Sequence, residues 1–589
     1  MIPLDIPAKD VVAGKKPDMS DRKNLLRSRK MSNGTPFGSE LMAELMSARW
    51  PKAYCALILT AIIAALLLRL PRLQQRPMHG DEAVHACKFG DLLEGRGYTY
   101  NSSEYHGPTL NYLTLIPAWI SRAHELAEVT EFTVRIVSVF FGVLLVVLFL
   151  LVVDGLGPAT MSWRAAFFAA VLAAISPAMV FYSRYYIQEI LLVCFTFGAI
   201  ACGYRYTQNK NVLWAILTGV FLGLMHATKE TCIIAFGSMA LALLLVVLVS
   251  RRESGVGPNA GKRLKPAHLA AGFAAAVIVS ALFYSSFLTN PDGVLDSFRT
   301  YRAYFGRAGH NAIHIHPWHY YLKMLLCSRY YDGPVWSEAF IVVLAVVGLV
   351  VAMRGKGGNY RLLRFIAFYT VIMTVIYSVI PYKTPWCLLG FLHGMIILAG
   401  VGAAAVLKLA PCGLSRCLVG LLLFVGGTHL VWQAYLGSYR FYADNRNPYV
   451  YAHPTMDVIE MAARVEEIAH VHKDGRQMQV QVICPGHDYW PLPWYLRSFR
   501  NAKWHDKVSD EVASAALIIA SPSVEQELLT KLYQLPPPGR KNLYVPVFDT
   551  YMELRPRIEL RGYVTQELWD RFTQQMRVHE DVRPGDEDE

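Results

Sequence analysis

The sequence has little charge for its length, because only 17% of its 589 residues are Asp, Glu, Lys or Arg. A soluble chain is nearer to about 25% charged, whereas this one is 54% hydrophobic, with a mean hydropathy of +0.28. The missing charge goes with repeated apolar runs of about 17–25 residues, long enough to cross a bilayer as helices. The composition therefore argues against a soluble protein and predicts an integral membrane protein.

Cysteine patterns are also missing. The ten cysteines include no CxxC pair and no Cys/His spacing typical of zinc sites. Most of them, such as Cys194 and Cys202, lie in or beside apolar runs, where a thiol acts as a small apolar side chain. No repeat of solenoid period occurs. These absences argue against a disulfide scaffold, a zinc module and a repeat protein.

The start of the chain lacks the pattern of a cleavable signal peptide. Residues 1–52 are polar and basic, and we expect a disordered cytoplasmic segment. The first apolar run, 53–70, is better interpreted as a retained signal anchor. The net charge of +12 is compatible with nucleic-acid binding. We interpret it instead as topogenic, because the basic residues cluster in membrane-flanking loops, as the positive-inside rule expects.

Hydropathy predicts eleven membrane spans. With a cytoplasmic N-terminus, an odd count places the C-terminal domain outside the cytoplasm. The loops that this topology makes cytoplasmic carry most of the basic residues, including Arg251, Arg252, Arg354 and Lys356. The predicted spans are 53–70, 133–153, 165–182, 190–206, 212–226, 231–250, 268–288, 337–353, 363–381, 385–407 and 414–432.

One apolar segment, 109–120, is short for a span, and we expect it to form a helix lying in the membrane interface. If it crossed, every later loop would change side and the charge pattern would fail. We place the whole transmembrane domain at 53–435. Its non-cytoplasmic loops are 71–132, 183–189 and 289–336.

The remainder of the chain reads as a soluble domain. Residues 436–575 combine a helical stretch at 455–472 with β-rich runs, which indicates a small α/β domain, and residues 576–589 form an acidic tail. The fold class is thus a polytopic α-helical membrane protein with a C-terminal non-cytoplasmic α/β domain. The predicted strands are 478–484, 515–521 and 543–548.

Two adjacent carboxylates, Asp81 and Glu82, follow directly after the first span. Charge beside a bilayer is costly and usually functional. A carboxylate within hydrogen-bond reach can take the proton of an acceptor hydroxyl, so a general base is one interpretation. The other is a helix N-terminus, where acids complement the helix dipole. Both interpretations can hold together.

Three cations lie in outward segments where they could bind a lipid phosphate. Arg184 lies in the 183–189 turn, Lys383 in a short outward connection, and Lys229 in another turn. Guanidinium and ammonium groups both suit phosphate. The alternatives are interfacial anchoring for Arg184 and a local ion pair with Glu230 for Lys229.

Polar side chains around these groups are candidates for substrate binding. Three histidines of the 289–336 loop indicate a metal site or proton handling, although their spacing matches no specific metal signature. The alternative for that set is an aromatic and histidine-rich interfacial loop, so the cofactor is either none or a divalent metal. The substrate-binding candidates are His79, Glu104, His106, Tyr185, Gln188 and Glu189, and the metal candidates are His314, His316 and His319.

Six segments over residues 53–435 carry a family resemblance: HGDEAVHA, EYHGPTLNY, SRYYIQE, ATKET, HIHPWHYYL and YKTPW. Their order resembles the GT-C glycosyltransferases, and within them the protein O-mannosyltransferase and aminoarabinose transferase superfamily. They look closest to a prokaryotic, mannosyltransferase-like and flippase-associated subgroup. No insertion like a β-trefoil MIR domain occurs in the 289–336 loop, unlike eukaryotic protein O-mannosyltransferases.

The resemblance implies an enzyme of the inner or plasma membrane. It would move a sugar from a polyprenyl-phosphate carrier to a hydroxyl acceptor on a protein, lipid or glycan outside the cytoplasm, with inversion. Asp81 matches the essential carboxylate of the superfamily, Glu82 its second acid, and Glu189 the acid of the second outer loop. Tyr-His-Gly-Pro, which includes His106, stands where aminoarabinose transferases carry a Phe-Glu-Lys-Pro-like segment, so the usual lysine is replaced.

Two other functions stay open at this point. A transporter of lipid-linked glycans would need cations in its cavity but no carboxylate base. A non-catalytic scaffold of surface-glycan assembly would use the C-terminal domain for its interactions.

Overall fold

The structure is a computed structural model that describes residues 52–102, 106–254, 264–310, 314–357, 360–534 and 542–581. The predicted cytoplasmic segment up to residue 51, the candidate Glu104 and residues 582–589 of the acidic tail lie outside the described residues. The described residues from Leu57 on belong to one compact unit.

Most of the chain before the C-terminal domain is helical. The helices there are α3 (Lys52–Arg69), α4 (Gly80–Leu93), α5 (Thr109–Ile120), α6 (Glu131–Val147), α7 (Ala159–Ile175), α8 (Pro177–Tyr182), α9 (Glu189–Asn209), α10 (Val212–His226), α11 (Cys232–Ser254), α12 (Pro266–Tyr284), α13 (Asp292–His310), α14 (Tyr320–Leu326), α15 (Ala339–Arg354), α16 (Arg361–Val379), α17 (Leu389–Leu409) and α18 (Gly413–Tyr435).

Seven helices of the described chain are long and apolar enough to cross a membrane, and this confirms an integral membrane protein. They are α6, α9, α11, α12, α16, α17 and α18, some with short flanking turns. Four shorter apolar helices, within α3, α7, α10 and α15, coincide with the remaining predicted spans. The count of eleven stays a prediction.

One predicted span, 165–182, is divided in the structure. Helix α7 ends at Ile175, and α8 begins at Pro177. The ring of a proline disfavours helical backbone at the preceding residue, and Ser176 accordingly has ψ of 125°. Its hydroxyl then caps α8 by accepting from the backbone N–H of Met179. The break turns the chain just before the 183–189 segment.

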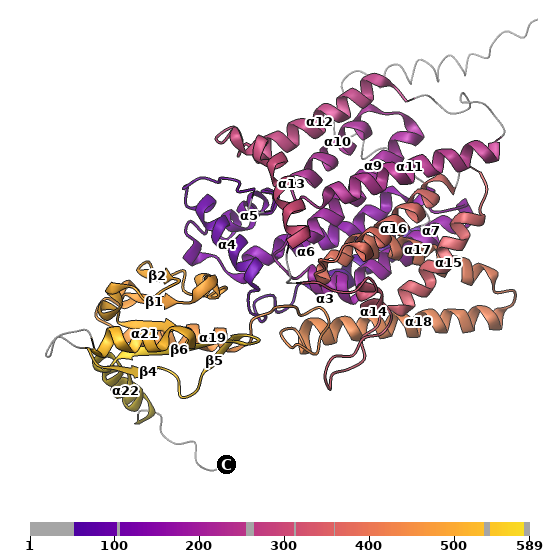
Figure 1. Ribbon diagram of the computed structural model, residues 1–589. Coiled ribbons are helices and arrows are strands. Elements are labelled where there is room, and N and C mark those ends of the chain that lie inside the picture. Colours follow the sequence, from indigo (N-terminus) through magenta and orange to yellow (C-terminus); the bar gives the residue numbers. More distant parts are fainter. Residues whose placement is uncertain are drawn as a thin grey trace, which may run out of the picture. The chain divides into compact units, whose positions relative to one another are not determined.

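The helices approach one another closely where they carry glycine. Figure 1 shows α15, α16 and α17 running side by side. A methyl group at Gly348 would lie 1.9 Å from the carbonyl oxygen of Leu398, and one at Gly402 would lie 2.0 Å from that of Leu344. Small residues permit such contacts between membrane helices. Helix α17 is accordingly enclosed, with 89% of its apolar stretch buried, whereas α18 has 6% buried.

The loop that follows α3 contains two helices, α4 and α5. The predicted segment 109–120 is a helix of 12 residues, so its secondary structure is confirmed. Its place in the membrane interface stays a prediction. Because α4 begins at Gly80, the Asp81–Glu82 pair lies in the first turn of a helix, as the dipole argument anticipated.

The C-terminal domain is built on a mixed six-stranded sheet. Strands β2, β1 and β3 are parallel, while β6 runs antiparallel to β3, β4 and β5. The sheet order is β2-β1-β3-β6-β4, with β5 paired to β6. The strands are β1 (Val480–Ile483), β2 (Ala502–His505), β3 (Leu517–Ala520), β4 (Tyr544–Pro546), β5 (Met552–Arg555) and β6 (Ile558–Thr565).

Helices cover both faces of this sheet. One face packs on α19 (Asp457–Val471), α20 (Leu492–Tyr495) and α22 (Gln566–Asp581), and the other packs on α21 (Glu525–Leu529) and its neighbouring turns. The α/β class is confirmed, and three of the strands fall at the predicted positions. Strands β2, β5 and β6 were not predicted. Helix α22 extends into the predicted acidic tail as far as Asp581.

Candidate functional site

The site is organised by the N-terminus of α4. The ring of His79 caps this helix, since its Nδ1 accepts from the backbone N–H of Asp81 at 3.1 Å. The carboxylate of Glu82 accepts from the backbone N–H of His79 at 2.9 Å and completes a capping box. Asp81 and Glu82 are therefore fixed on one turn of helix, although their side chains have different surroundings.

Glu82 is fully buried and holds the loop together. Its two oxygens accept from Arg76 at 2.8 and 2.9 Å and from Arg135 at 2.9 and 3.0 Å. The backbone N–H of Tyr186 donates to it as well, at 2.8 Å. Burial disfavours the carboxylate, but the charges of Arg135 and Arg76 outweigh this and hold the pKa of Glu82 well below its ordinary value. Glu82 thus joins the first loop, α6 and the 183–189 turn.

Asp81 is accessible instead, with 55% of its side chain exposed. Its Oδ2 lies 3.9 Å from Nδ1 of His79. Burial of the surrounding site opposes ionisation, but the electrostatic interactions with His79, His85, His106 and Lys229 prevail and lower the pKa of Asp81. The site therefore offers an ionised carboxylate that a substrate can reach.

Lys229 lies against Glu189 rather than beside Glu230, its neighbour in sequence. Its ammonium group donates to Oε1 of Glu189, and both side chains are buried. Burial alone would lower the pKa of Lys229, but the charge of Glu189 raises it above its ordinary value. The local Lys229–Glu230 pair considered from the sequence is not the pair the structure contains. A cation thus lies within electrostatic range of Asp81.

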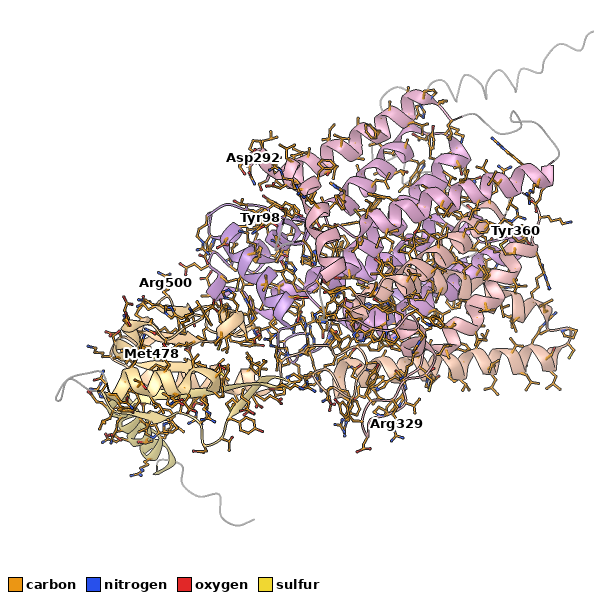
Figure 2. The ribbon with its side chains drawn as sticks, in the orientation of Figure 1. Tyr98, Asp292, Arg329, Tyr360, Met478 and Arg500 are labelled. Carbon is orange, nitrogen blue, oxygen red and sulfur yellow. The ribbon has the colours of Figure 1, made fainter. Side chains whose placement is uncertain are left out.

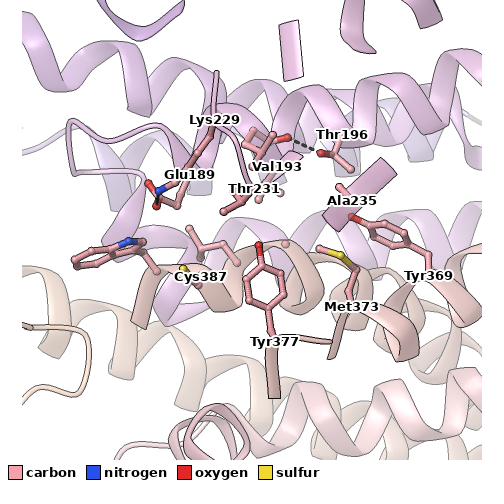
Figure 3. A pocket seen from close by; sticks show the side chains of 14 residues that line it. Glu189, Val193, Thr196, Lys229, Thr231, Ala235, Tyr369, Met373, Tyr377 and Cys387 are labelled. Carbon is pink, nitrogen blue, oxygen red and sulfur yellow. Dashed lines mark hydrogen bonds and ion pairs between the residues drawn. The ribbon is translucent and has the colours of Figure 1, made fainter. Parts of the chain in front are cut away.

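A small cavity adjoins this ion pair. Figure 3 shows Lys229 and Glu189 together at one end, with Tyr369 and Met373 at the other. Its volume is about 30 Å³, which is enough for a water molecule and too little for a sugar. The cavity is lined from α9, α11, α16 and α17, so it runs from the turns that contain Glu189 and Lys229 toward the middle of the helices.

A further buried acid, Glu230, lies close to this ion pair. It accepts from the hydroxyl of Tyr100 at 3.0 Å, and one ring nitrogen of His106 lies 2.8 Å from its other oxygen. Burial opposes its ionisation, but the charge of His106 outweighs burial and lowers the pKa of Glu230 to about 2. The ring of His106 lies 5.8 Å from that of His85, whose pKa burial lowers to about 3. These contacts tie His106 into the same polar cluster as Asp81.

Other predicted residues lie around this cluster. The amide nitrogen of Gln188 lies 3.1 Å from a ring nitrogen of His85, and the guanidinium of Arg76 stacks over the ring of Tyr185 at 3.5 Å. The carbonyl of Tyr451, from the segment leading into the C-terminal domain, lies 3.1 Å from Nε2 of His79. His79, His106, Gln188 and Glu189 thus gather near Asp81, as does Tyr185 beneath Arg76.

The two remaining predicted cations are occupied by backbone carbonyls. The guanidinium of Arg184 donates to the carbonyls of Arg69, Pro71 and Arg72, at 2.7, 2.8 and 3.1 Å. Lys383 donates to the carbonyl of His316 at 3.3 Å and to that of Ile380, and burial lowers its pKa. These bonds favour structural roles, and phosphate binding by either residue stays a prediction.

The histidines of the 289–336 loop bind a tyrosine. Nδ1 of His314 lies 2.5 Å and Nε2 of His316 lies 3.2 Å from the hydroxyl of Tyr451. His319 stacks edge-on against Trp318. Over the described ranges, no group of three His, Cys, Asp or Glu side chains is placed to hold a metal ion. This arrangement does not fit the predicted metal site at His314, His316 and His319.

The C-terminal domain holds the first loop from its other side. The hydroxyl of Tyr495 accepts from the backbone N–H of Met78 at 2.8 Å, and the indole of Trp494 donates to Glu131 at 2.8 Å. Arg500, labelled in Figure 2, pairs with Glu125 at 2.9 Å. Residues on both sides of α4 are therefore positioned by this domain.

Sequence reasoning missed several members of the site, chiefly Arg76, Arg135, Glu230 and Tyr451. A signal for Arg135 was present, because it is a charged residue inside the predicted span 133–153, and buried charges in spans are rarely without a partner. Glu230 was considered only as a local ion-pair partner of Lys229, and nothing local marked Arg76 or Tyr451.

Comparisons with known proteins cover most of the chain. The family model for dolichyl-phosphate-mannose-protein mannosyltransferases matches residues 112–289. Comparison with curated proteins finds no match. ArnT from Cupriavidus metallidurans bound to undecaprenyl phosphate is similar in structure, with a TM-score of 0.57, 16% identity, and coverage of 86% of this chain and 97% of that one.

Two further solved structures are similar. The apo state of the same ArnT gives a TM-score of 0.57 at 14% identity, covering 87% of this chain and 98% of that one. AglB from Archaeoglobus fulgidus, in complex with an inhibitory peptide and a dolichol-phosphate, gives a TM-score of 0.48 at 12% identity, covering 80% and 70%. The likeness to ArnT extends over both the helical part and the C-terminal domain.

Proposed function

We propose that this chain, which has the GT-C fold, is a membrane glycosyltransferase that uses a polyprenyl-phosphate sugar as donor. The acceptor is a hydroxyl group of a protein, lipid or glycan, and the reaction takes place on the non-cytoplasmic side with inversion at the anomeric carbon. The matching family model and the ArnT fold support the class of reaction. The mannosyltransferase-like donor preference rests on the sequence resemblance.

The observation that carries the proposal is the accessibility of Asp81 beside a buried Glu82. The oxygens of Glu82 are already bonded to two arginines and two backbone N–H groups, so the accessible carboxylate of the pair is Asp81. An ionised, accessible carboxylate can accept the proton of an attacking hydroxyl. In the proposed step the acceptor oxygen bonds to the anomeric carbon, its proton goes to Asp81, and the carbon–oxygen bond to the phosphate breaks. Polyprenyl phosphate then leaves with the bonding electrons.

Lys229 is the cation best placed to stabilise the leaving phosphate. The charge of Lys229 helps to lower the pKa of Asp81. Its partner Glu189, at the start of α9, raises the pKa of Lys229 and so keeps it protonated. A preformed cation at the position where charge develops lowers the barrier without reorganisation. Arg184 and Lys383 donate to backbone carbonyls, so we assign them to holding the loops, and Lys229 to the phosphate.

Carrier consumption by the purified protein in nanodiscs tests the proposal. A panel of synthetic polyprenyl-phosphate sugars is supplied with a crude membrane extract as the source of acceptor, and free polyprenyl phosphate is measured. We expect release with one donor and its loss in Asp81→Asn. Absence of release with every donor, despite tight binding of the carrier, would favour a transporter or a scaffold instead.

A further inference from the structure

A second cavity, far from Asp81 in sequence, lies in the C-terminal domain. Its volume is about 380 Å³, within the range of small-molecule sites, about 300–1,000 Å³. It lies between the segment that follows β1 and the segment that follows β3, is bordered by the start of β6, and is open to solvent on one side. Its lining also includes two prolines and two aliphatic residues, and the other lining side chains are those of Cys484, Asp488, Ser521, Ser523, Arg557 and Glu559.

The sheet topology explains why a cavity lies there. From β1 the chain passes through α20 to β2 on one side of the sheet order, and from β3 it passes through α21 to β4 on the other. The two crossovers also cover opposite faces, because α20 packs in one core and α21 in the other. The loops at the carboxyl ends of β1 and β3 therefore diverge. This is the topological switch point at which open α/β sheets bind ligands.

The lining is polar and carries no excess of positive charge. The hydroxyls of Ser521 and Ser523 lie 2.9 Å apart. The carboxylates of Asp488 and Glu559 line the cavity together with Arg557, and Asp488 is bound by Arg555 at 2.8 Å. With two acids and two arginines in and beside the cavity, a phosphate or another anion gains no net attraction. A neutral ligand with several hydroxyl groups could bond to all four kinds of side chain.

One buried donor beside the cavity is also unused. In the described chain, Nε of Arg555 is buried without a hydrogen-bond partner, although its terminal nitrogen holds Asp488. Buried donors of this kind are rare and need an explanation. An oxygen-rich ligand seated against Asp488 would lie close to this guanidinium.

We propose that this cavity is a binding site for a neutral carbohydrate of one or two rings. The site is separate from the one proposed for transfer, since its lining residues are not among the groups that lower the pKa of Asp81. The segment after β1 nevertheless links the two places: Asp488 lines the cavity, and Cβ of Trp490 lies 3.9 Å from the Cβ position of Gly80, beside Asp81. A glycan held here would be presented near the first loop.

Saturation-transfer NMR on the full-length protein in nanodiscs tests the site. The probes are glucose, galactose, mannose, N-acetylglucosamine and maltose, compared with glucuronate and with inorganic phosphate as a competitor. The test variants are Ser523→Trp, which fills the cavity, and Glu559→Gln, which removes one acceptor charge. Both positions are exposed, so folding should be retained. The control is Glu567→Gln, an exposed acid of the same domain.

We expect saturable binding of at least one neutral sugar, weakened about tenfold or more by each test variant and unchanged by Glu567→Gln and by Asp81→Asn. The inference is overturned if no neutral sugar binds, if Ser523→Trp leaves binding unchanged, or if glucuronate or phosphate displaces the sugars. A signal that Asp81→Asn removes and Ser523→Trp spares would belong to the transferase site, and would also overturn it. If the wild-type protein consumes none of the carrier donors but still binds a neutral sugar here, the proposed function is refuted and this site stands.

Discussion

The ammonium group of Lys229 and the carboxylate of Glu189 form a buried ion pair between two turns of the helical part. Lys229 precedes α11 and Glu189 begins α9, so the pair joins helices separated by a full hairpin. A buried pair adds little net stability, whereas removing one partner is expensive, because it leaves an uncompensated charge. The pair is therefore suited to fixing the position of the Lys229 ammonium group while its positive charge still acts on neighbouring groups.

Single and double variants of this ion pair can distinguish a structural role of Lys229 from a role in binding phosphate. Lys229→Met and Glu189→Gln should each lower the free energy of unfolding by about 3–5 kcal/mol. The double variant should regain most of that loss, because neither charge is left alone. If Lys229 binds the phosphate, the double variant should still show a KM for the carrier raised about tenfold or more. Thermal unfolding and carrier titrations measure the two effects, and full recovery of KM in the double variant would reduce the pair to a structural role.

Asp81→Asn should remove the proton acceptor and leave the fold unchanged. Since the side chain is 55% exposed, we expect little change in the melting temperature, while carrier release falls by a factor of about 10²–10⁴. The matched control is Asp91→Asn, which makes the same substitution in the last turn of the same helix, where the acid pairs with Arg96. Equal losses in both variants would show that the effect comes from α4 as a whole.

The apolar runs of the sequence predicted the helices well, because hydropathy reports directly on burial in a membrane. They did not predict the break at Ser176, since residues 165–182 are apolar throughout and only Pro177 marks it. Strand β6 was missed because its sequence, IELRGYVT, mixes charges and glycine with apolar residues. Its partner β3 lies some forty residues earlier, so the pairing that stabilises it is not local.

The site was predictable at Asp81 and much less so around it. A conspicuous acid after a span is visible in one dimension, and so is a cluster of polar residues in a short turn. The difference between the surroundings of Asp81 and those of Glu82 cannot be predicted in this way, because it depends on Arg135, which is 53 positions away from Glu82. Two neighbouring acids look equivalent until the fold delivers arginines to one of them.

Glu82→Gln should be destabilising, and by an amount that depends on pH. The folded-state pKa of Glu82 is lowered, so its contribution to stability is fully present above the unfolded pKa, about 4.3, and is lost as pH falls below that value. The gap in melting temperature between wild type and Glu82→Gln should therefore be widest near neutral pH and narrow on acidification. Glu567→Gln, at an exposed acid, should show no gap. A gap that stays constant down to about pH 3 would contradict the assignment.

The C-terminal domain should be required for chemistry as well as for assembly. Tyr495 and Trp494 hold Met78 and Glu131, on either side of α4, so a chain truncated after residue 440 should release no more carrier product than Asp81→Asn.

Truncation alone also removes other contacts, so a finer change is needed. Tyr495→Phe deletes only the hydroxyl that accepts from Met78, and should lower kcat while the melting temperature falls by a few degrees at most. The control is Tyr533→Phe, which removes a hydroxyl bonded within the domain to Tyr544. If the truncated chain inserts correctly and keeps full carrier release, the domain does not position the Asp81 loop, and the contacts at Tyr495 and Trp494 serve only to attach it.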